Sequence, residues 1–215
     1  MGAVRQRPIV LGITGGVATG KSTVLGMFAK RGAFAISADE IARSLLAPGA
    51  STTMRVLAHF GPSFALKGTS DTVDRSALGR LVFADEQARR ELGKLMHPAI
   101  HEELQREIDK ACRDPECLLA AAEIPLLYEN RLERMVDRVV VATCSAPEQL
   151  RRLMARVHGL SESEALAQIH AQIPTQSKAE MSDFVIDTGA SLNDVDDEVG
   201  RLFTLLAARR VEEPG

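Results

Sequence analysis

The sequence predicts an α/β fold built on a doubly wound parallel sheet of about five strands. Short apolar runs rich in β-branched residues alternate with stretches of helical periodicity, as in parallel strands joined by helices. The chain has 215 residues, a length that suits one such domain with insertions. Apolar residues make up 45% of the chain, which is enough to cover both faces of a sheet.

The predicted strands share one pattern: each is short, mainly apolar and bounded by Gly, Pro or polar residues. In the first, β-branched and apolar residues follow Pro8 up to Gly15, as in a strand buried on both faces. The strands are expected at residues 8–14, 33–37, 117–127, 138–144 and 184–188. The tail 211–215 is expected to be frayed.

Helical periodicity fills the intervals between the strands. The helix after the first strand is expected to end near Gly32, because glycine favours the left-handed conformation that follows a helix. Ser145 with Glu148, and Ser161 with Glu164, have the spacing of capping boxes that begin helices. Further helices are expected at 38–46 and 195–210.

Residues 52–111 contain little strand signal and several helical stretches. The last of these is expected to break at Pro98, because proline lacks an N–H group and clashes with the preceding turn. Residues 61–73 are typical of a loop or a short hairpin. We therefore expect a single domain over residues 1–215, with a helical insertion at 52–111 between the second and third strands.

Composition and charge argue against several classes of partner. Aromatic residues make up 4% of the chain, with one Tyr and no Trp, whereas single-strand nucleic-acid binding needs stacking rings. The formal net charge of −3 gives no general attraction to nucleic acid or anionic membranes. The three cysteines form no C-x-x-C pair, which indicates a reducing compartment, and no apolar run approaches the ~18 residues of a membrane span. We expect a cytoplasmic protein that binds neither nucleic acid nor membrane; its oligomeric state stays open.

The stretch "LGITGGVATGKST", residues 11–23, contains the pattern G-x-x-x-x-G-K-[ST], formed by Gly15, Gly20, Lys21 and Ser22. Backbone N–H groups of such a turn bind phosphate together with the positive end of the following helix. Lys21 is expected to reach the β- and γ-phosphates from an exposed position in the empty cradle, and the Ser22 hydroxyl to ligate Mg²⁺. The residues expected to bind the nucleotide are Gly16, Val17, Ala18, Thr19, Gly20, Lys21, Ser22 and Thr23.

The position of this motif between a predicted strand and a predicted helix argues against a chance glycine turn. The motif indicates nucleotide binding but not the reaction. The sequence lacks the N-K-x-D base reader of guanine-specific switches and the L-S-G-G-Q segment of transporter ATPases. Two classes remain: a small P-loop kinase whose acceptor is held by the inserted helices, and a P-loop regulatory protein that binds nucleotide without transferring a phosphoryl group.

Two carboxylates are candidates for the chemistry beside the cradle. Asp39 follows the second strand, where ligands of doubly wound folds gather, and it can accept the proton of an attacking hydroxyl. It can equally be the N-cap of a helix that begins at Glu40. Glu123, late in the third strand, can hold Mg²⁺ through water or simply end the strand. Four histidines lack the spacing of zinc ligands: His59, His101, His158 and His170.

Several further elements occur in an order and spacing that identify a family. They are "GITGGVATGKST", "SADEIAR", "LMHPAI", "IPLLYE", "QLRRLMAR" and "AQIPTQSKAEMSDFVID". In these elements the chain resembles the dephospho-CoA kinases nearly end to end. The resemblance implies a P-loop NTPase fold with a helical acceptor subdomain and a lid at residues 152–180. It also implies MgATP-dependent phosphorylation of the ribose 3′-hydroxyl of dephospho-CoA, the last step of coenzyme A biosynthesis.

The resemblance further assigns roles to single residues. The matching positions are Lys21, Asp39 and Arg152 as catalytic residues, with Asp39 as the base; Asp39, Arg43, His97 and Leu126 as substrate-binding residues; Arg156 as a nucleotide-binding residue; and Ser22 as the metal-binding residue. Two assignments have alternatives. His97, next to a proline, also suits a structural hydrogen bond, and Arg152 with Arg156 also suits a solvated helix face.

The sequence departs from the family pattern at several positions. Ser37 stands where the family has the first Asp of a D-A-D element, so a carboxylate near metal or substrate is lost. Ala18 replaces a glycine, which the cradle tolerates if this residue does not need a positive φ. Thr188 stands in place of a usual Asn, and Ser182 in place of a usual Ala.

Overall fold

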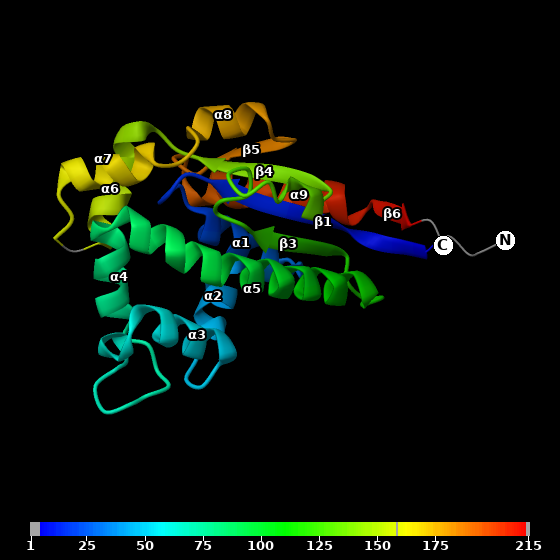
Figure 1. Cartoon of the computed structure of the whole chain (residues 1–215). Helices are drawn as coiled ribbons and strands as arrows, with labels where there is room; N and C mark the ends of the chain where they lie inside the picture. The colour runs from blue at the N-terminus through cyan, green and yellow to red at the C-terminus, as the bar shows by residue number, and fades with distance from the viewer. Residues whose placement is uncertain (1–4, 158, 214–215) are drawn as a thin grey trace. The chain divides into compact units, whose positions relative to one another are not determined.

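The structure is a computed structural model that describes residues 5–157 and 159–213 (Figure 1). Its contacts divide the chain into two compact units. The sheet unit comprises Met1–Ser37 and Glu107–Gly215, and the helical unit comprises Ala38–Arg106. The sequence suggested an insertion at 52–111. The helical unit begins earlier, at Ala38, and ends slightly earlier, at Arg106.

The sheet unit contains a doubly wound sheet with the strand order β2-β3-β1-β4-β5, and every pair in this order is parallel. Its strands are β1 (Arg5–Gly15), β2 (Phe34–Ser37), β3 (Leu119–Glu123), β4 (Arg138–Thr143) and β5 (Phe184–Asp187). This arrangement confirms the predicted fold class. The helical unit is inserted between β2 and β3, as predicted.

One strand was not predicted. β6 (Arg210–Glu213) pairs antiparallel with the first residues of β1, in the register Arg5↔Glu213 to Pro8↔Arg210. The prediction of a frayed tail is therefore wrong for residues 211–213, and residues 214–215 lie outside the described part of the chain. The reason is long-range pairing: β1 begins before Pro8, and its early residues offer backbone groups that the returning chain binds.

Helices pack against the sheet. Those of the sheet unit are α1 (Lys21–Lys30), α6 (Ala146–Arg156), α7 (Glu162–His170), α8 (Thr175–Glu180) and α9 (Leu192–Ala207), with a 3₁₀ turn, η2, at Glu133–Met135. α1 and α9 contact each other and cover one face, whereas α8 packs along β4 and β1. In Figure 1, α8 lies above β5 and β4.

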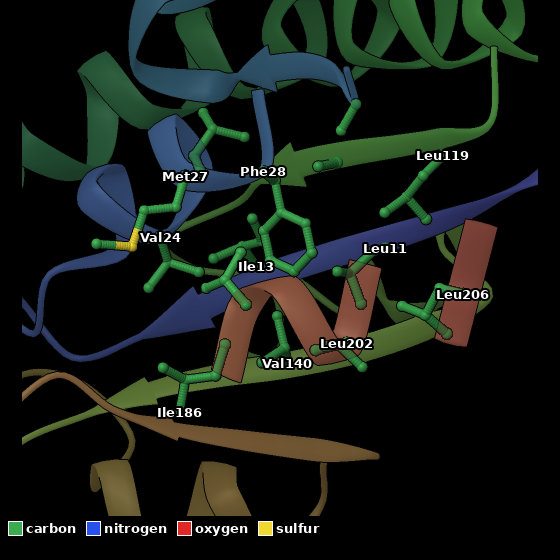
Figure 2. Packing of buried hydrophobic residues seen from close by; sticks show 14 of the residues in the cluster. Leu11, Ile13, Val24, Met27, Phe28, Leu119, Val140, Ile186, Leu202 and Leu206 are labelled. Carbon is green, nitrogen blue, oxygen red and sulfur yellow. The ribbon is translucent and has the colours of Figure 1, made fainter. Parts of the chain in front are cut away.

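The core of the sheet unit follows from strand alternation. Leu11 and Ile13 of β1 point toward α1 and α9, where they meet the fully buried Phe28 (Figure 2). Gly12, between them, faces the other side, and a Cβ there would lie 3.0 Å from Leu127. Both faces of β1 are therefore covered, as the unbroken apolar run predicted.

The helical unit has its own apolar core. Its elements are α2 (Ala38–Leu45), α3 (Ser51–Phe60), a 3₁₀ turn, η1 (Pro62–Phe64), α4 (Arg75–Ala84) and α5 (Glu86–Arg113), whose last residues belong to the sheet unit. The core consists of Val56, Leu57, Val73, Leu78 and Met96. A bridge between Ala65 and Val73 forms the short hairpin that the sequence offered as one alternative.

Pro98 does not break the last helix of this region. α5 runs without interruption from Glu86 to Arg113 and contains Pro98. A proline inside a helix removes one backbone hydrogen bond and costs about 3 kcal/mol. Met96 and Ile100, on either side of the proline, both pack in the core of the helical unit. Burial on both sides of Pro98 keeps the helix continuous.

The predicted helix starts have mixed outcomes. Ser161 and Glu164 form the expected capping box at the start of α7. Ser145 is the N-cap residue of α6, but its side chain makes no cap hydrogen bond, and the Glu148 carboxylate accepts from Arg151 and Arg152. α2 begins at Ala38, so Asp39 lies in its first turn, and the alternative of Asp39 as N-cap is wrong.

Candidate active site

The cradle, residues 15–22, occupies the turn between β1 and α1, at the carboxyl end of the central strand. Gly20 has φ 84, a left-handed conformation that suits glycine. A Cβ on Gly16 would lie 2.5 Å from Gln149 Nε2, so only glycine allows this close approach. The backbone therefore needs both glycines where the motif places them.

Ala18 adopts φ 60, which is left-handed backbone. The sequence predicts that alanine is tolerated here if the residue does not need a positive φ. The residue does adopt a positive φ, so that condition is not met. For an L-residue with a Cβ this conformation costs roughly 1–2 kcal/mol. The cradle keeps its shape at Ala18 with stored backbone strain.

Lys21 is buried and hydrogen-bonded, with only 7% of the residue exposed. Its Nζ donates to the carbonyl oxygen of Gly16 at 2.7 Å. The expectation that its side chain would be exposed in the empty cradle is wrong, because a buried ammonium needs an acceptor and the loop carbonyl provides one. The Thr19 hydroxyl donates to the same oxygen at 2.9 Å.

Ser22 and Glu123 form the acid–hydroxyl pair of the site. Ser22 Oγ donates to Glu123 Oε1 at 2.9 Å, and Glu123 is only 3% exposed. Glu123 ends β3, where it lies in register with Ile13 on one side and Ser37 on the other. A hydroxyl and a carboxylate beside a phosphate cradle are oxygen ligands of the kind that Mg²⁺ prefers.

Arg152 is held by three acceptors. Its Nε donates to Glu148 Oε1 at 2.7 Å, and its two terminal nitrogens donate to the hydroxyl and the carbonyl of Thr188 at 2.9 and 2.8 Å. Hydrogen bonds from Arg151 and Arg152 lower the pKa of Glu148 to about 2. Arg156 is exposed at the last position of α6. The solvated-face alternative therefore does not describe Arg152.

Thr188 connects Arg152 to the cradle. Its buried hydroxyl lies 2.9 Å from the carbonyl oxygens of both Thr19 and Thr143. A Cβ on Gly20 would touch the Thr188 side chain at 3.1 Å. The sequence marked Thr188 only as a departure from a family pattern and gave no sign of this role.

Two glutamines of the site were missed by the sequence analysis. Gln149 Nε2 donates to the carbonyl oxygen of Val17 at 2.9 Å, and the Val17 N–H donates to Gln172 Oε1 at 2.8 Å. Both side chains thus hold the backbone of one residue of the cradle, Val17, from the two peptide units that flank it. Gln149 and Gln172 lie within the family elements "QLRRLMAR" and "AQIPTQSKAEMSDFVID", but glutamine has no motif of its own, and the resemblance assigned neither residue a role.

The remaining predicted residues are distributed between the two units. Leu126 lies in the turn after β3 of the sheet unit. Asp39 and Arg43, one helical turn apart, are exposed on α2 of the helical unit. His97 of the same unit stacks on His101, with ring centroids 6.0 Å apart. Burial, and then the neighbouring His97, lower the pKa of His101.

Within residues 5–157 and 159–213, no three or more His, Cys, Asp or Glu residues are grouped to hold a metal ion. His158, one of the histidines considered for zinc, lies outside these residues. Over the same ranges, no helix has both the length and the apolar character needed to span a membrane. The cysteines in the described chain form no disulfide.

A cradle after the central strand of a doubly wound sheet, with a buried lysine and an acid–hydroxyl pair, defines a P-loop protein of the kinase type. A shikimate kinase from Bacteroides thetaiotaomicron shares this fold, with a TM-score of 0.50 and 15% identity over 92% of this chain and 98% of that one.

The family follows from closer matches. The family model described as dephospho-CoA kinase matches residues 9–194, and the chain belongs to this family. It is 38% identical to the dephospho-CoA kinase of Syntrophotalea carbinolica over 92% of each chain. It is also 38% identical to that of Bacillus licheniformis, over 90% of this chain and 94% of the relative.

Solved structures agree with this assignment. The dephospho-CoA kinase from Campylobacter jejuni superposes with a TM-score of 0.67 at 27% identity, over 92% of this chain and 96% of that one. A crystal structure of a Thermus thermophilus protein gives a TM-score of 0.72 at 30% identity, over 93% and 98% of the two chains.

Proposed function

We propose that the chain transfers the γ-phosphoryl group of ATP to the ribose 3′-hydroxyl of dephospho-CoA, giving coenzyme A and ADP. One observation carries the proposal: a complete phosphate cradle, with its lysine and its acid–hydroxyl pair, lies in a chain that matches the dephospho-CoA kinase family over residues 9–194. In this chemistry, positioning and charge stabilisation provide nearly all of the catalysis.

The nucleotide binds in the cradle. Backbone N–H groups within residues 16–23 and the N-terminus of α1 receive the phosphates, while the Val17 N–H stays bonded to Gln172 Oε1. Lys21 exchanges the Gly16 carbonyl for phosphate oxygens, a short movement because its Nζ already lies on the loop. Arg152 and Arg156 add positive charge from α6, and residues 152–180 form a lid that excludes water from the transfer.

The oxygen ligands of the site fit Mg²⁺. Ser22 Oγ and, through water, Glu123 would hold the ion, since both present oxygen atoms at the cradle and lie 2.9 Å apart. When bound, the ion neutralises charge on the phosphate oxygens during transfer. Ser37 contributes no carboxylate, so Glu123 is the acid that this chain offers at the ends of β2 and β3.

Asp39 acts as the base. It accepts a hydrogen bond from the ribose hydroxyl and takes its proton as the oxygen attacks phosphorus. It follows the carboxyl end of β2 in the first turn of α2, and Arg43, one turn later, meets a phosphate of the acceptor. We assign acceptor binding to His97 in the helical unit and to Leu126 in the sheet unit, as the resemblance implies, and we assign the helical unit the role of acceptor subdomain.

The direct test is to incubate the purified protein with MgATP and dephospho-CoA and to detect coenzyme A by its mass. Phosphorus NMR of the product separates 3′ from 2′ phosphorylation. Formation of the 3′ product supports the proposal. ATP binding with no product from dephospho-CoA contradicts it and favours a nucleotide-binding regulator.

Because the cysteines form no disulfide and the substrates are cellular metabolites, we place the reaction in the cytoplasm.

A further inference from the structure

The backbone of Val17 is held on both sides, at its N–H group and at its carbonyl oxygen. Its N–H donates to Gln172 Oε1 at 2.8 Å, and its carbonyl oxygen accepts from Gln149 Nε2 at 2.9 Å. Gln149 lies on α6, just before residues 152–180. Gln172 lies within these residues, just after α7. The backbone of Val17 in the phosphate cradle is therefore bound by one side chain just before the segment that we propose as a lid and by one within it.

We call Gln149 and Gln172, which both bind Val17, the clasp. The two side chains differ in how closely they are packed. Gln149 is only 6% exposed, and it packs so closely on Gly16 that no Cβ fits there. Both glutamines line a cavity of about 440 Å³, but Gln172 is only partly buried. Gln172 is therefore less closely packed than Gln149, and its hydrogen bond to Val17 contributes more to holding it in place.

The chain after Gln172 is held by two contacts with the Glu129 carboxylate. The Ile173 N–H donates to Glu129 Oε1 at 3.1 Å. Lys178 is completely buried, and its Nζ lies 2.7 Å from the same carboxylate oxygen. A buried ion pair of this kind is costly to separate. Gln172 thus lies between α7 and the segment 173–178, which Glu129 anchors.

We propose that Gln149 and Gln172 are positioning residues that couple nucleotide binding in the cradle to closure of residues 152–180. The inference rests on the proposed function, because it takes this segment as the lid. A triphosphate constrains the backbone of the cradle, including Val17, and the clasp connects that backbone to α6 before the segment and to the residue after α7 within it. Coupling between sites is reciprocal, so a closed segment also tightens the cradle on ATP.

The test compares Gln172→Met with Gln176→Met. The first variant keeps the side-chain length and removes the acceptor for the Val17 N–H. The control changes Gln176, a nearby exposed glutamine whose Nε2 donates to Glu180 Oε1 on the same helix. For each protein we would measure the Kd for ATP, hydrogen exchange of α7 with and without ATP, and ADP formed per coenzyme A formed.

We expect Gln172→Met to raise the Kd for ATP by about 2- to 10-fold, the range of one hydrogen bond. At saturating ATP, exchange in α7 should slow in the wild type and in the control but not in Gln172→Met. The variant should also release more ADP per coenzyme A, because an open segment admits water. Gln172→Glu keeps an acceptor oxygen and should restore the slowing of exchange.

Gln149→Met removes the other glutamine of the clasp and serves as the second variant, with melting temperatures reported for all proteins. If both clasp variants bind ATP and slow exchange in α7 as the control does, the coupling role is wrong. If ATP fails to slow exchange in the wild type, the lid and the coupling are both wrong. Neither result bears on whether coenzyme A is formed, which the mass assay decides separately.

Discussion

The sheet unit and the helical unit use charged side chains in different ways. In the sheet unit they bind the backbone of the site: Lys21 donates to a loop carbonyl, and Arg152 to the carbonyl and hydroxyl of Thr188. In the helical unit Arg75 also donates to a backbone carbonyl, that of Arg43, but the ion pairs among the described residues of this unit are local pairs along α5, such as Arg90 with Glu86. Both partners of that pair are more than 60% exposed.

This difference has an energetic meaning. Exposed pairs within a helix are screened by water and contribute little to stability. Buried groups bonded to backbone fix geometry, and losing one partner leaves the other unsatisfied. The sheet unit is thus built to hold phosphate groups in one place. The helical unit is built by apolar packing, and the residues to which we assign a function there, such as Asp39, are exposed.

The largest expected effect tests the one catalytic role that we place in the helical unit. Asp39→Asn keeps the size of the side chain and removes the base, so kcat should fall by roughly 10²- to 10⁴-fold while the Kd for ATP stays within a few-fold of wild type. Turnover with dephospho-CoA, ATP titration and thermal melting measure these quantities.

Glu40→Gln is the matched control for Asp39→Asn. Both residues are exposed in the first turn of α2, so both changes remove a negative charge near the helix N-terminus. The control should retain nearly full turnover. Equal, small losses in the two variants would show that Asp39 only supports the helix and that the base lies elsewhere.

A second loss of rate is expected at Lys21. Lys21→Met keeps an apolar stem in the buried site and removes the charge, so kcat should fall on the order of 10²-fold or more. The fold should persist, because the Gly16 carbonyl still accepts from the Thr19 hydroxyl. Steady-state kinetics and a melting curve separate the two effects, and near-normal turnover would remove the lysine from the mechanism.

Stability should distinguish the two units directly. Asp137 binds Arg7 through both carboxylate oxygens and accepts the Val10 N–H, and the two charged side chains are 19% and 17% exposed. Asp137→Asn should cost about 1–3 kcal/mol of the free energy of unfolding. Urea denaturation measures this loss.

The matching change in the helical unit is Glu102→Gln, since Glu102 pairs with Arg106 on the exposed side of α5. Its side chain is 68% exposed, so the unfolding midpoint should hardly move. A loss at Glu102 as large as that at Asp137 would contradict the comparison between the units.

The smallest effect is expected at Ala18. Ala18→Gly relieves backbone strain of roughly 1–2 kcal/mol, but glycine gains about 0.5–1 kcal/mol of conformational freedom in the unfolded chain. The protein should therefore melt slightly higher. Ala171→Gly is the control, because Ala171 has φ −72, and it should melt lower. A lower melting temperature in both variants would show that Ala18 is not strained.

The sequence by itself determined the fold class and the position of the cradle. Both are local signals: β-branched runs predict buried strands, and the glycines with Lys21 and Ser22 predict a phosphate site wherever a strand precedes and a helix follows. The capping box at Ser161 was predictable for the same reason, because its partners lie within one helical turn.

The tertiary structure alone decided the features that join distant parts of the chain. Pairing of β6 with β1, continuity of α5 through Pro98, and burial of Lys21 against the Gly16 carbonyl depend on neighbours that no local pattern specifies. The clasp of Gln149 and Gln172 on Val17 is of the same kind. A glutamine amide is equally suited to solvent or to a backbone partner, and only the folded chain brings the partner within hydrogen-bonding distance.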